Sequence, residues 1–384
     1  MSDYPSEWRV EMIGEICEIH DSKRIPLSSD QRRDRKGPYP YYGANNIQDS
    51  IDDFIFDFDA VLLAEDGGYY DEYETRDIAQ YATGRYWVNN HAHILTGGES
   101  LDTKFLYFSL VRKNICPWIN TGTRAKLNQA DLRQIEIAVP PLPEQKKIAE
   151  ILSSIDRSIA INTNKIKSLE TLYTSLLADS LKKLPGNCLE MQLSDACKEV
   201  FLGLTSKVDY VENEGIPLIR ASNIKSGMID FNSARQISHK QHLSLTKYRK
   251  AGRGDVLVTK SGSLGECAIV HTQEEFSIYE SIVCLKPKPG IVSTEYLFHA
   301  MQCNAVKDQF LSGKVGSAVA HLNLNDFRQI ALPVPSLEDQ KVISTALDAV
   351  QKTKDHLQAD TEKKIFLKNA LSTDLLSGCK RVSI

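Results

Sequence analysis

The sequence predicts an α+β protein in which two mixed α/β domains are joined by two long antiparallel helices, with approximate two-fold symmetry between its halves. Two observations lead to this prediction. One segment occurs twice along the chain, and each copy precedes a long stretch with apolar residues at helical spacing. A length of 384 residues, 42% of them hydrophobic, suits two or three folded units.

The repeated segment spans Leu127–Lys147 and Leu322–Val342, which lie 195 positions apart. Eleven of the 21 aligned pairs are identical, whereas chance would give about one on ordinary composition. Weaker similarities occur upstream of the repeated segment, in the same order in both halves. They pair Pro40–Ile47 with Pro217–Ile224, Asp59–Gly67 with Asp255–Gly262, and Thr103–Tyr107 with Thr294–Phe298. The chain is therefore expected to hold two copies of one unit whose outer parts have diverged.

Each copy is expected to end in a strand followed by a long helix. The largely apolar runs Arg133–Val139 and Arg328–Leu332 predict strands, each of which ends at a proline. Pro143 and Glu144 suit the first turn of a helix, and Ser336–Asp339 resembles a capping box with Asp in place of Glu. The predicted domains are residues 1–142 and 186–335, and the predicted helical segments are residues 143–185 and 336–384.

Both helical segments carry residues spaced alternately four and three apart, which is typical of a coiled coil. The residues expected to pair the helices are Ile148, Leu152, Ile155, Ile159, Asn162, Ile166, Leu169, Tyr173 and Leu176, and then Ile343, Leu347, Val350, Leu357 and Leu371. Asn162 is the one strongly polar member of the first series. The second series breaks at Lys354, which predicts weaker packing. Ordinary core helices are the alternative interpretation.

Two domains carried on antiparallel helices would lie at opposite ends of the helix pair. At 1.5 Å per residue, Glu144–Leu181 forms a rod of about 55 Å. One turn of B-DNA spans about 34–36 Å, so two domains spaced in this way could each reach the major groove. Because the two copies differ in sequence, they would read two unlike half-sites of an asymmetric, split DNA site.

The overall charge neither supports nor excludes DNA binding. The formal net charge is −4, and the first 139 residues hold 15 Lys and Arg against 23 Asp and Glu. DNA requires only a local basic surface. Two basic groups occur, Lys23, Arg24, Arg32, Arg33, Arg35 and Lys36 in the first half and Lys240, Lys247, Arg249, Lys250 and Arg253 in the second. Solvated loops are the alternative for both.

The sequence predicts neither a catalytic nor a metal site. It lacks the P-loop, the G-x-G-x-x-G pattern after a strand, HExxH and an Asn-Pro-Pro methyltransferase motif. An acid and a lysine that weakly resemble those of a nuclease occur at Glu144-Gln-Lys146 and Glu362-Lys-Lys364, but both pairs lie on predicted helices without an upstream Pro-Asp. The eight cysteines are scattered. His91 and His93 are expected on one polar face of a strand over Trp87–Leu95.

Neither a signal-peptide pattern nor a run of about 18 apolar residues occurs in the sequence, so a cytoplasmic location is expected.

The repeated motifs resemble those of a known family. Pro140–Asp156 and Pro333–Val350, each after a block of about 140–150 residues, resemble the two conserved regions of type I restriction-modification specificity subunits. The terminal Asp374–Gly378 is similar to that family's ending. The resemblance covers essentially the whole chain. It departs from the pattern where Glu338-Asp339 stands in place of Pro143-Glu144.

The resemblance implies a non-catalytic DNA-recognition subunit with two target recognition domains. It further implies that the helices bind two methyltransferase subunits and that restriction subunits, which translocate DNA, join the complex. Double-stranded DNA would be the ligand. S-adenosylmethionine, ATP and Mg²⁺ would belong to the partner subunits, with no cofactor in this one.

Residues that suit contacts to phosphates or base edges lie in the basic groups and in paired loops. The predicted DNA-binding residues are Lys23, Arg24, Arg32, Arg33, Arg35, Asn45, Asn46, Thr121, Gly122, Thr123, Arg124 and Lys126 in the first half, and Arg220, Ser222, Asn223, Lys247, Arg249, Arg253, Lys260, Ser261, Ser263, Ser312, Gly313, Lys314 and Ser317 in the second. The rival functions are a protein-docking scaffold without DNA, a stand-alone nuclease, and a specificity module of a related system.

Overall fold

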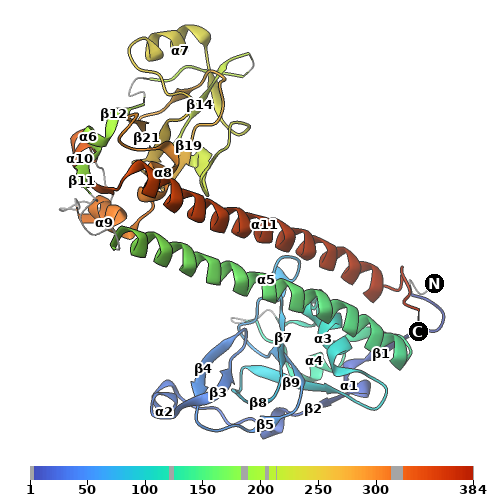
Figure 1. Ribbon diagram of the computed structural model, residues 1–384. Helices are drawn as coiled ribbons and strands as arrows, with labels where there is room; N and C mark the ends of the chain where they lie inside the picture. Colours follow the sequence, from blue (N-terminus) through green and yellow to red (C-terminus); the bar gives the residue numbers. More distant parts are fainter. Residues whose placement is uncertain are drawn as a thin grey trace. The chain divides into compact units, whose positions relative to one another are not determined.

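The computed structural model describes residues 4–120, 125–182, 189–203, 207–212, 214–312 and 323–383. The chain folds into two compact units, Met1–Thr163 with Ala359–Ile384, and Asn164–Gln358 (Figure 1). Each unit therefore contains one predicted recognition domain and a part of both long helices.

The first unit contains two four-stranded sheets with the orders β2-β9-β6-β7 and β4-β3-β8-β5. Its strands are β1 (Arg9–Met12), β2 (Cys17–Ile19), β3 (Lys36–Tyr42), β4 (Ile47–Ile51), β5 (Phe56–Asp57), β6 (Ala60–Ala64), β7 (Ala79–Ala82), β8 (Arg85–Val88), β9 (Ala92–Gly97) and β10 (Glu136–Val139). Its shorter helices are α1 (Ile13–Ile16), α2 (Ser29–Arg33), α3 (Thr103–Val111) and α4 (Gln129–Leu132), with 3-10 turns η1 (Asp21–Lys23), η2 (Tyr70–Glu72) and η3 (Cys116–Trp118).

Strand β6 is the centre of this unit's core. All five residues of its sequence AVLLA are buried, because it is paired on both sides and covered on both faces. Helix α3 covers one face, and Asp102 caps its start by accepting a hydrogen bond from the Phe105 N–H at 2.8 Å. The end of β6 is thereby held in a fixed position.

The second unit also contains two four-stranded sheets, and the first of them repeats the strand arrangement of β2-β9-β6-β7. Its four-stranded sheets have the orders β12-β21-β18-β19 and β13-β17-β14-β20. Its strands are β11 (Leu189–Gln192), β12 (Cys197–Leu202), β13 (Tyr210–Val211), β14 (Ile216–Ile219), β15 (Ile224–Lys225), β16 (Met228–Ile229), β17 (Arg235–Ile237), β18 (Val256–Thr259), β19 (Cys267–Ile269), β20 (Ser277–Ile278), β21 (Ile282–Pro287) and β22 (Ala331–Val334). Its shorter helices are α6 (Leu193–Ala196), η4 (Ala221–Asn223), α7 (His239–Thr246), α8 (Thr294–Ala300), α9 (Asn304–Ser312) and α10 (Leu324–Gln329).

The structure extends the repeat to the first strand of each domain, where the sequence alone showed no similarity between the two halves. Strand β1 leads into α1 as β11 leads into α6. Each first strand pairs antiparallel with the strand of the repeated segment, Arg9 opposite Val139 and Leu189 opposite Val334. The first and last strands of each domain therefore lie together, next to the start of the long helix.

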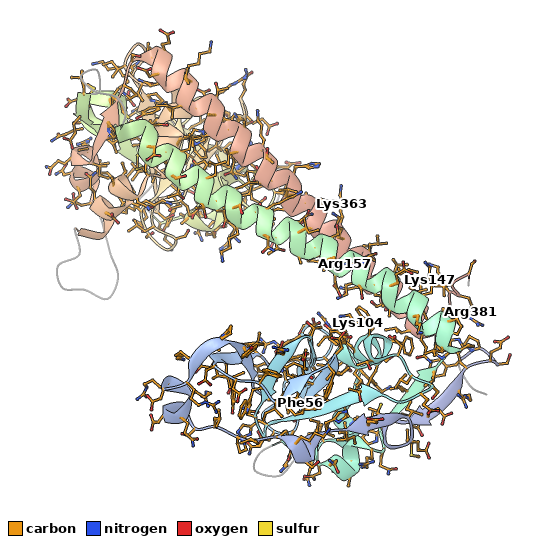
Figure 2. All side chains as sticks on the ribbon, turned by 60° about the horizontal axis from the view of Figure 1, so that its bottom comes forward. Phe56, Lys104, Lys147, Arg157, Lys363 and Arg381 are labelled. Carbon is orange, nitrogen blue, oxygen red and sulfur yellow. The ribbon has the colours of Figure 1, made fainter. Side chains whose placement is uncertain are left out.

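The two long helices are α5 (Leu142–Lys182) and α11 (Leu337–Leu376). Within the first unit they run antiparallel, because Asp156 contacts Lys368 and the later Asn162 contacts the earlier Asp360. The tail after α11 returns to the start of α5, where Arg381 lies (Figure 2).

The predicted α+β class with two repeated domains and two long helices is confirmed. The Ser336 hydroxyl accepts from the Asp339 N–H at 3.2 Å, as predicted for the start of α11. The predicted strands over 133–139 and 328–332 begin later, at Glu136 and Ala331, because short helices precede them. Within the described ranges, no helix is long and apolar enough to span a membrane.

Candidate nucleic-acid interface

In the first unit, three loops meet at the end of β6. The amide of Asn45 donates to the carbonyl of Gly67 at 2.9 Å, which ties the loop after β3 to the loop after β6. Asp66 and Lys126 form an isolated β-bridge, and the Leu127 N–H donates to the Glu65 carbonyl at 2.8 Å. The structure thus brings together the predicted residues Asn45 and Lys126, although they are 81 positions apart in the sequence.

The second unit forms the corresponding cluster from the loops after β14 and β18. Ser281 links them, since its hydroxyl accepts from the Ala221 N–H at 3.1 Å and its carbonyl from the Lys260 N–H at 2.8 Å. A Cβ on Gly262 would lie 4.0 Å from the Cβ of Ala221. The predicted segments Arg220–Asn223 and Lys260–Ser263 are therefore neighbours.

The strand register shows which residues correspond in the two clusters. The Tyr42 carbonyl accepts from Asn89 just as the Ile219 carbonyl accepts from Tyr279, so Gly43 corresponds to Arg220. Val61 pairs with Leu95 as Val256 pairs with Leu285, so Glu65 corresponds to Lys260.

Two glycines support the second of these assignments. Gly67 and Gly262 are 195 positions apart, and both adopt positive φ, at 64° and 78°. The same turn therefore presents an acid in the first unit and a lysine in the second.

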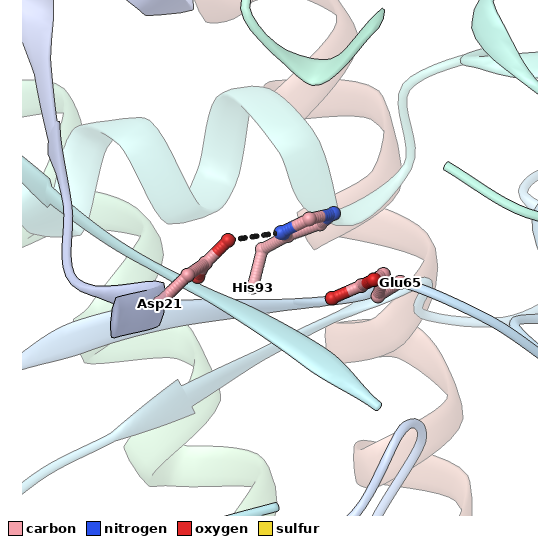
Figure 3. Close-up of side chains that lie close together, drawn as sticks. All are labelled: Asp21, Glu65 and His93. Carbon is pink, nitrogen blue, oxygen red and sulfur yellow. Dashed lines mark hydrogen bonds and ion pairs between the residues drawn. The ribbon is translucent and has the colours of Figure 1, made fainter. Parts of the chain in front are cut away.

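Beneath the first cluster lies a buried network of charges (Figure 3). His93 contacts Asp21 at 2.6 Å through Nδ1 and the Leu127 carbonyl at 2.8 Å through Nε2. Arg24 donates to Glu65 at 2.8 Å and lies 3.7 Å from Asp21. Burial by itself would raise the pKa of Asp21, but the hydrogen bonds and charges of its neighbours, His93 foremost, outweigh burial and lower it.

This network accounts for three residues whose arrangement also suits a metal ion. Ligand atoms of Asp21, Glu65 and His93 lie within 4.8 Å of one another. Both ring nitrogens of His93 already face acceptors, and Glu65 is bound by Arg24 and by Lys126, the latter at 3.1 Å. Protein groups thus already contact the ligand atoms of all three residues, and we interpret the cluster as structural.

The histidines depart from their predicted arrangement. The predicted strand over Trp87–Leu95 is two strands, β8 and β9, and His91 lies in the connection between them. There its ring contacts Asp66 at 2.7 Å, whereas His93 is buried, with 1% of its surface exposed. The two rings therefore serve two separate contacts, and a shared polar strand face is wrong.

The first basic group is largely neutralised within its own domain. Arg32 lies 3.6 Å from Asp49, Arg33 lies 3.1 Å from Asp30, and Arg35 lies 2.9 Å from Asp52. Lys36 also pairs with Asp49. Arg24 is turned into the buried network and is therefore removed from the proposed DNA surface. Lys23 is exposed, and none of the described residues forms an ion pair with it.

The second basic group remains available. Lys247, Arg249 and Arg253 are exposed, and the described part of the chain supplies none of them with an ion pair. Lys250 contacts Glu275 at 2.5 Å. The cationic surface therefore belongs to the second unit, which the charge count along the sequence did not distinguish from exposed loops.

A family model described as type I restriction modification DNA specificity domain matches residues 5–171 and, a second time, residues 191–366. The chain belongs to this family of specificity subunits. A putative type I restriction enzyme specificity subunit of Haemophilus influenzae is 28% identical over 351 residues, covering 89% of this chain and 86% of the relative. A putative type I specificity subunit of Mycoplasma pneumoniae is 23% identical, with 88% of each chain covered.

Solved structures share the fold of this specificity subunit. The S subunit of a type I restriction-modification system from M. genitalium superimposes with a TM-score of 0.69 at 15% identity, covering 98% of this chain and 99% of that one. A chain from a study of complex assembly and conformational transition of the type I system gives a TM-score of 0.53 at 15% identity, with 97% and 98% covered.

The specificity subunit joins each domain to its helix through an identical glutamine. Gln145 and Gln340 are fully buried. The side-chain oxygen of Gln145 accepts from the Asp102 N–H at 2.8 Å, and that of Gln340 accepts from the Ser293 N–H at 2.8 Å. Each amide also donates to two carbonyls, one of them in the proline before the helix. These two joints are equivalent in all three contacts.

Glu144, one member of the weak nuclease resemblance, belongs to the same region and is structural. It is fully buried and accepts from Arg381 at 2.6 and 2.8 Å and from the Trp8 indole at 3.3 Å.

The predicted helix-pairing residues all lie on protected faces of the two helices. Ile148, Leu152, Asn162, Ile343 and Leu347 are buried, and the other members of the two series are partly buried. Several of them also pack into the domain cores: Ile148 and Leu152 in the first unit, and Ile343 and Leu347 in the second. The helices thus contact the recognition domains as well as each other.

Some predicted residues play structural parts or fall outside the description. Asn223 is buried, and its side chain bonds the Arg220 N–H and the Ser233 hydroxyl. Asn46, Ser222 and Ser263 are exposed and Ser261 is partly buried. Thr121, Gly122, Thr123, Arg124, Gly313, Lys314, Ser317 and the side chain of Ser312 lie outside the described residues.

Sequence reasoning missed the aromatic partners of Arg220. Its guanidinium lies over the rings of Tyr210 and Tyr279, and Arg235 lies over Tyr210 as well. The tyrosines are 10 and 59 positions away in the sequence, so no local pattern connects them to the arginine.

Proposed function

We propose that this specificity subunit binds a split, asymmetric site in double-stranded DNA through its two recognition domains, and that it gathers methyltransferase and restriction subunits without performing chemistry itself. The observation that carries this proposal is the pair of corresponding loop clusters with unlike side chains. Gly43 and Glu65 stand in the first where Arg220 and Lys260 stand in the second.

This difference has a direct consequence for base recognition. Arg and Lys suit the acceptors of guanine, whereas carboxylates accept from the cytosine amino group and Asn suits adenine. The Glu65 carboxylate is already bound by Arg24 and Lys126, so Asn45 and Asn46 are the side chains that the first cluster offers to bases. The second cluster offers an arginine and a lysine instead. We therefore expect the two domains to read unlike half-sites, because corresponding loops of the same fold present different hydrogen-bond donors and acceptors.

Exposed leucines on the long helices support a partner that binds twice. Leu172 of α5 and Leu367 of α11 are 48% and 49% exposed and lie 195 positions apart, at the same place in the two repeats. Neither belongs to the helix-pairing series. Large apolar side chains left on a surface at matching positions favour protein contacts, and two methyltransferase subunits, one at each position, are the partners we propose.

The cofactors of the complex belong, in this proposal, to the partners. S-adenosylmethionine would be held by the methyltransferase subunits, and ATP and Mg²⁺ would be held mainly by the restriction subunits. The lack of a P-loop or a methyltransferase motif in the sequence supports this assignment.

Exchange of the first recognition domain tests the proposal. Residues 1–139 would be replaced by the homologous block of a relative, and the subunit co-expressed with its methyltransferase. Single-molecule methylation sequencing of the host DNA should show a motif in which one half has changed and the other is retained. A motif changed in both halves, or in neither, would contradict separate reading by two domains.

Salt dependence separates this function from a docking scaffold. Phosphate neutralisation releases counterions, so the affinity of a DNA reader falls steeply as salt rises. The purified complex should show this decline on a duplex carrying its motif. An affinity for DNA that is absent or independent of salt would favour the scaffold.

A further inference from the structure

The second unit holds one arginine between two aromatic rings. The guanidinium carbon of Arg220 lies 5.0 Å from the ring centre of Tyr210 and 4.9 Å from that of Tyr279. Arg235 lies 3.4 Å from the ring centre of Tyr210. Two rings restrict the guanidinium to few orientations, so little conformational entropy would be lost when it binds a ligand.

Arg220 has an N–H donor without an acceptor among the described residues. Among the described residues, no carboxylate forms an ion pair with Arg220, and its buried Nε has no hydrogen-bond acceptor. The buried hydroxyl of Tyr210 also has no partner within the described ranges. In the first unit, by contrast, Arg24 and Arg35 each contact a carboxylate. The Nε of Arg32 also lacks a hydrogen-bond partner, but a carboxylate, that of Asp49, lies 3.6 Å away. A buried N–H without an acceptor costs stability, and a bound ligand could supply the acceptor for Arg220.

Arg220 occupies the end of β14, at the border of the loop cluster. It directly precedes Ala221, which Ser281 links to Lys260. Tyr279 follows β20, the parallel neighbour of β14. Arg220 is therefore part of the surface that the proposed function assigns to DNA.

We propose that Arg220 reads one guanine of the half-site bound by the second unit, donating from its planar fork to O6 and N7 in the major groove. This inference rests on the proposed function. A fixed, planar pair of donors matches the edge of guanine, which is the commonest partner of arginine in specific DNA contacts. The first unit carries no counterpart, because the corresponding residue is Gly43, which has no side chain.

The test uses the full complex with its methyltransferase subunits. Arg220→Lys keeps the charge but removes the fork, so discrimination at one G·C pair should fall by about 5- to 150-fold, the contribution of one bidentate base contact. The other positions of both half-sites should be recognised as before. Arg112→Lys is the matched control, since Arg112 is bound to Asp77 in the first unit and its replacement should leave the motif unchanged.

Two results for Arg220→Lys would overturn the inference. Affinity lowered equally on all sequences, with the salt slope reduced by about one, would identify a phosphate contact. A lower melting temperature with an unchanged motif would identify a purely structural role for the stack.

A measurement on the unaltered protein covers the case in which the variant does not fold. Duplexes with 7-deazaguanine at each guanine of the second half-site lack one N7 acceptor each. Binding should weaken at one of these guanines, and equal binding to all of them would refute the assignment. A complex that recognises no motif at all would overturn the proposed function and this inference together.

Discussion

At the scale of single residues, the pair Asp21 and His93 couples the stability of the first unit to pH. The Asp21 carboxylate, 6% exposed, accepts from His93, from the Ile94 N–H at 3.0 Å and from Gln129 at 3.1 Å. Its pKa is lowered, so it stabilises the fold above the unfolded value of about 4 and loses this effect as pH falls. Asp21→Asn should cost about 3–5 kcal/mol at pH 7.

Urea unfolding followed by tryptophan fluorescence measures this effect, because Trp8, Trp87 and Trp118 all lie in the first unit. The difference between the wild type and Asp21→Asn should shrink between pH 5 and pH 3. Asp30→Asn is the control, since its pair with Arg33 is exposed and contributes about 1 kcal/mol at most. An equal loss for Asp21→Asn at all pH values would contradict the coupling.

The same scale shows what the sequence could not predict. Arg24, Arg35 and Arg220 are alike as arginines in loop-rich segments, but the fold gives the first two carboxylate partners and the third two tyrosines. These partners lie 10 to 59 positions away in the sequence. Residue type and local spacing therefore identified candidate cations, and only the tertiary structure separates structural cations from available ones.

At the scale of elements, the joints between domain and helix can be tested one at a time. Gln145→Leu would leave the Asp102 N–H and two carbonyls without their buried partner, at a cost of about 3 kcal/mol. Hydrogen exchange should show faster exchange at Asp102 in this variant and unchanged exchange at Ser293. Gln340→Leu should show the reverse.

The reciprocal pair of variants is its own control. If Gln145→Leu accelerated exchange at both amides, or at neither, the two joints would not be independent elements. Both outcomes are measurable without DNA or partner subunits, so they concern the fold alone.

The long helices illustrate how far a sequence pattern extends. The predicted break at Lys354 does not interrupt the spacing, because protected positions continue through Lys354, Leu357, Lys364, Lys368 and Leu371. Lysine can occupy such positions when its aliphatic stem packs against the neighbouring helix and its ammonium group forms an ion pair. The Lys368 ammonium forms such a pair with the Asp156 carboxylate at 2.6 Å. Leu367, which the apolar pattern alone would favour, is exposed.

At the scale of the whole molecule, the duplication was the most informative feature of the sequence. It predicted the fold class and the strand and long helix that end each copy, because these depend on buried positions that both copies retain. The interface was predicted less well. Its loops are assembled from segments such as Asn45 and Gly67, whose contact depends on the sheets behind them, and these are the parts in which the copies differ.

The length of the helix pair should set the spacing between the half-sites. Residues 159–165 of α5 and 357–363 of α11 are the heptads centred on Asn162 and Asp360, which contact each other. Deleting both heptads retains the spacing of the pairing series and shortens the pair by about 10 Å, which is about three base pairs at 3.4 Å each. Methylation sequencing should therefore show the same half-sites with a shorter spacer. Deleting one heptad alone shifts the two helices against each other and should abolish methylation, whereas an unchanged spacer after the double deletion would exclude a measuring role for the helices.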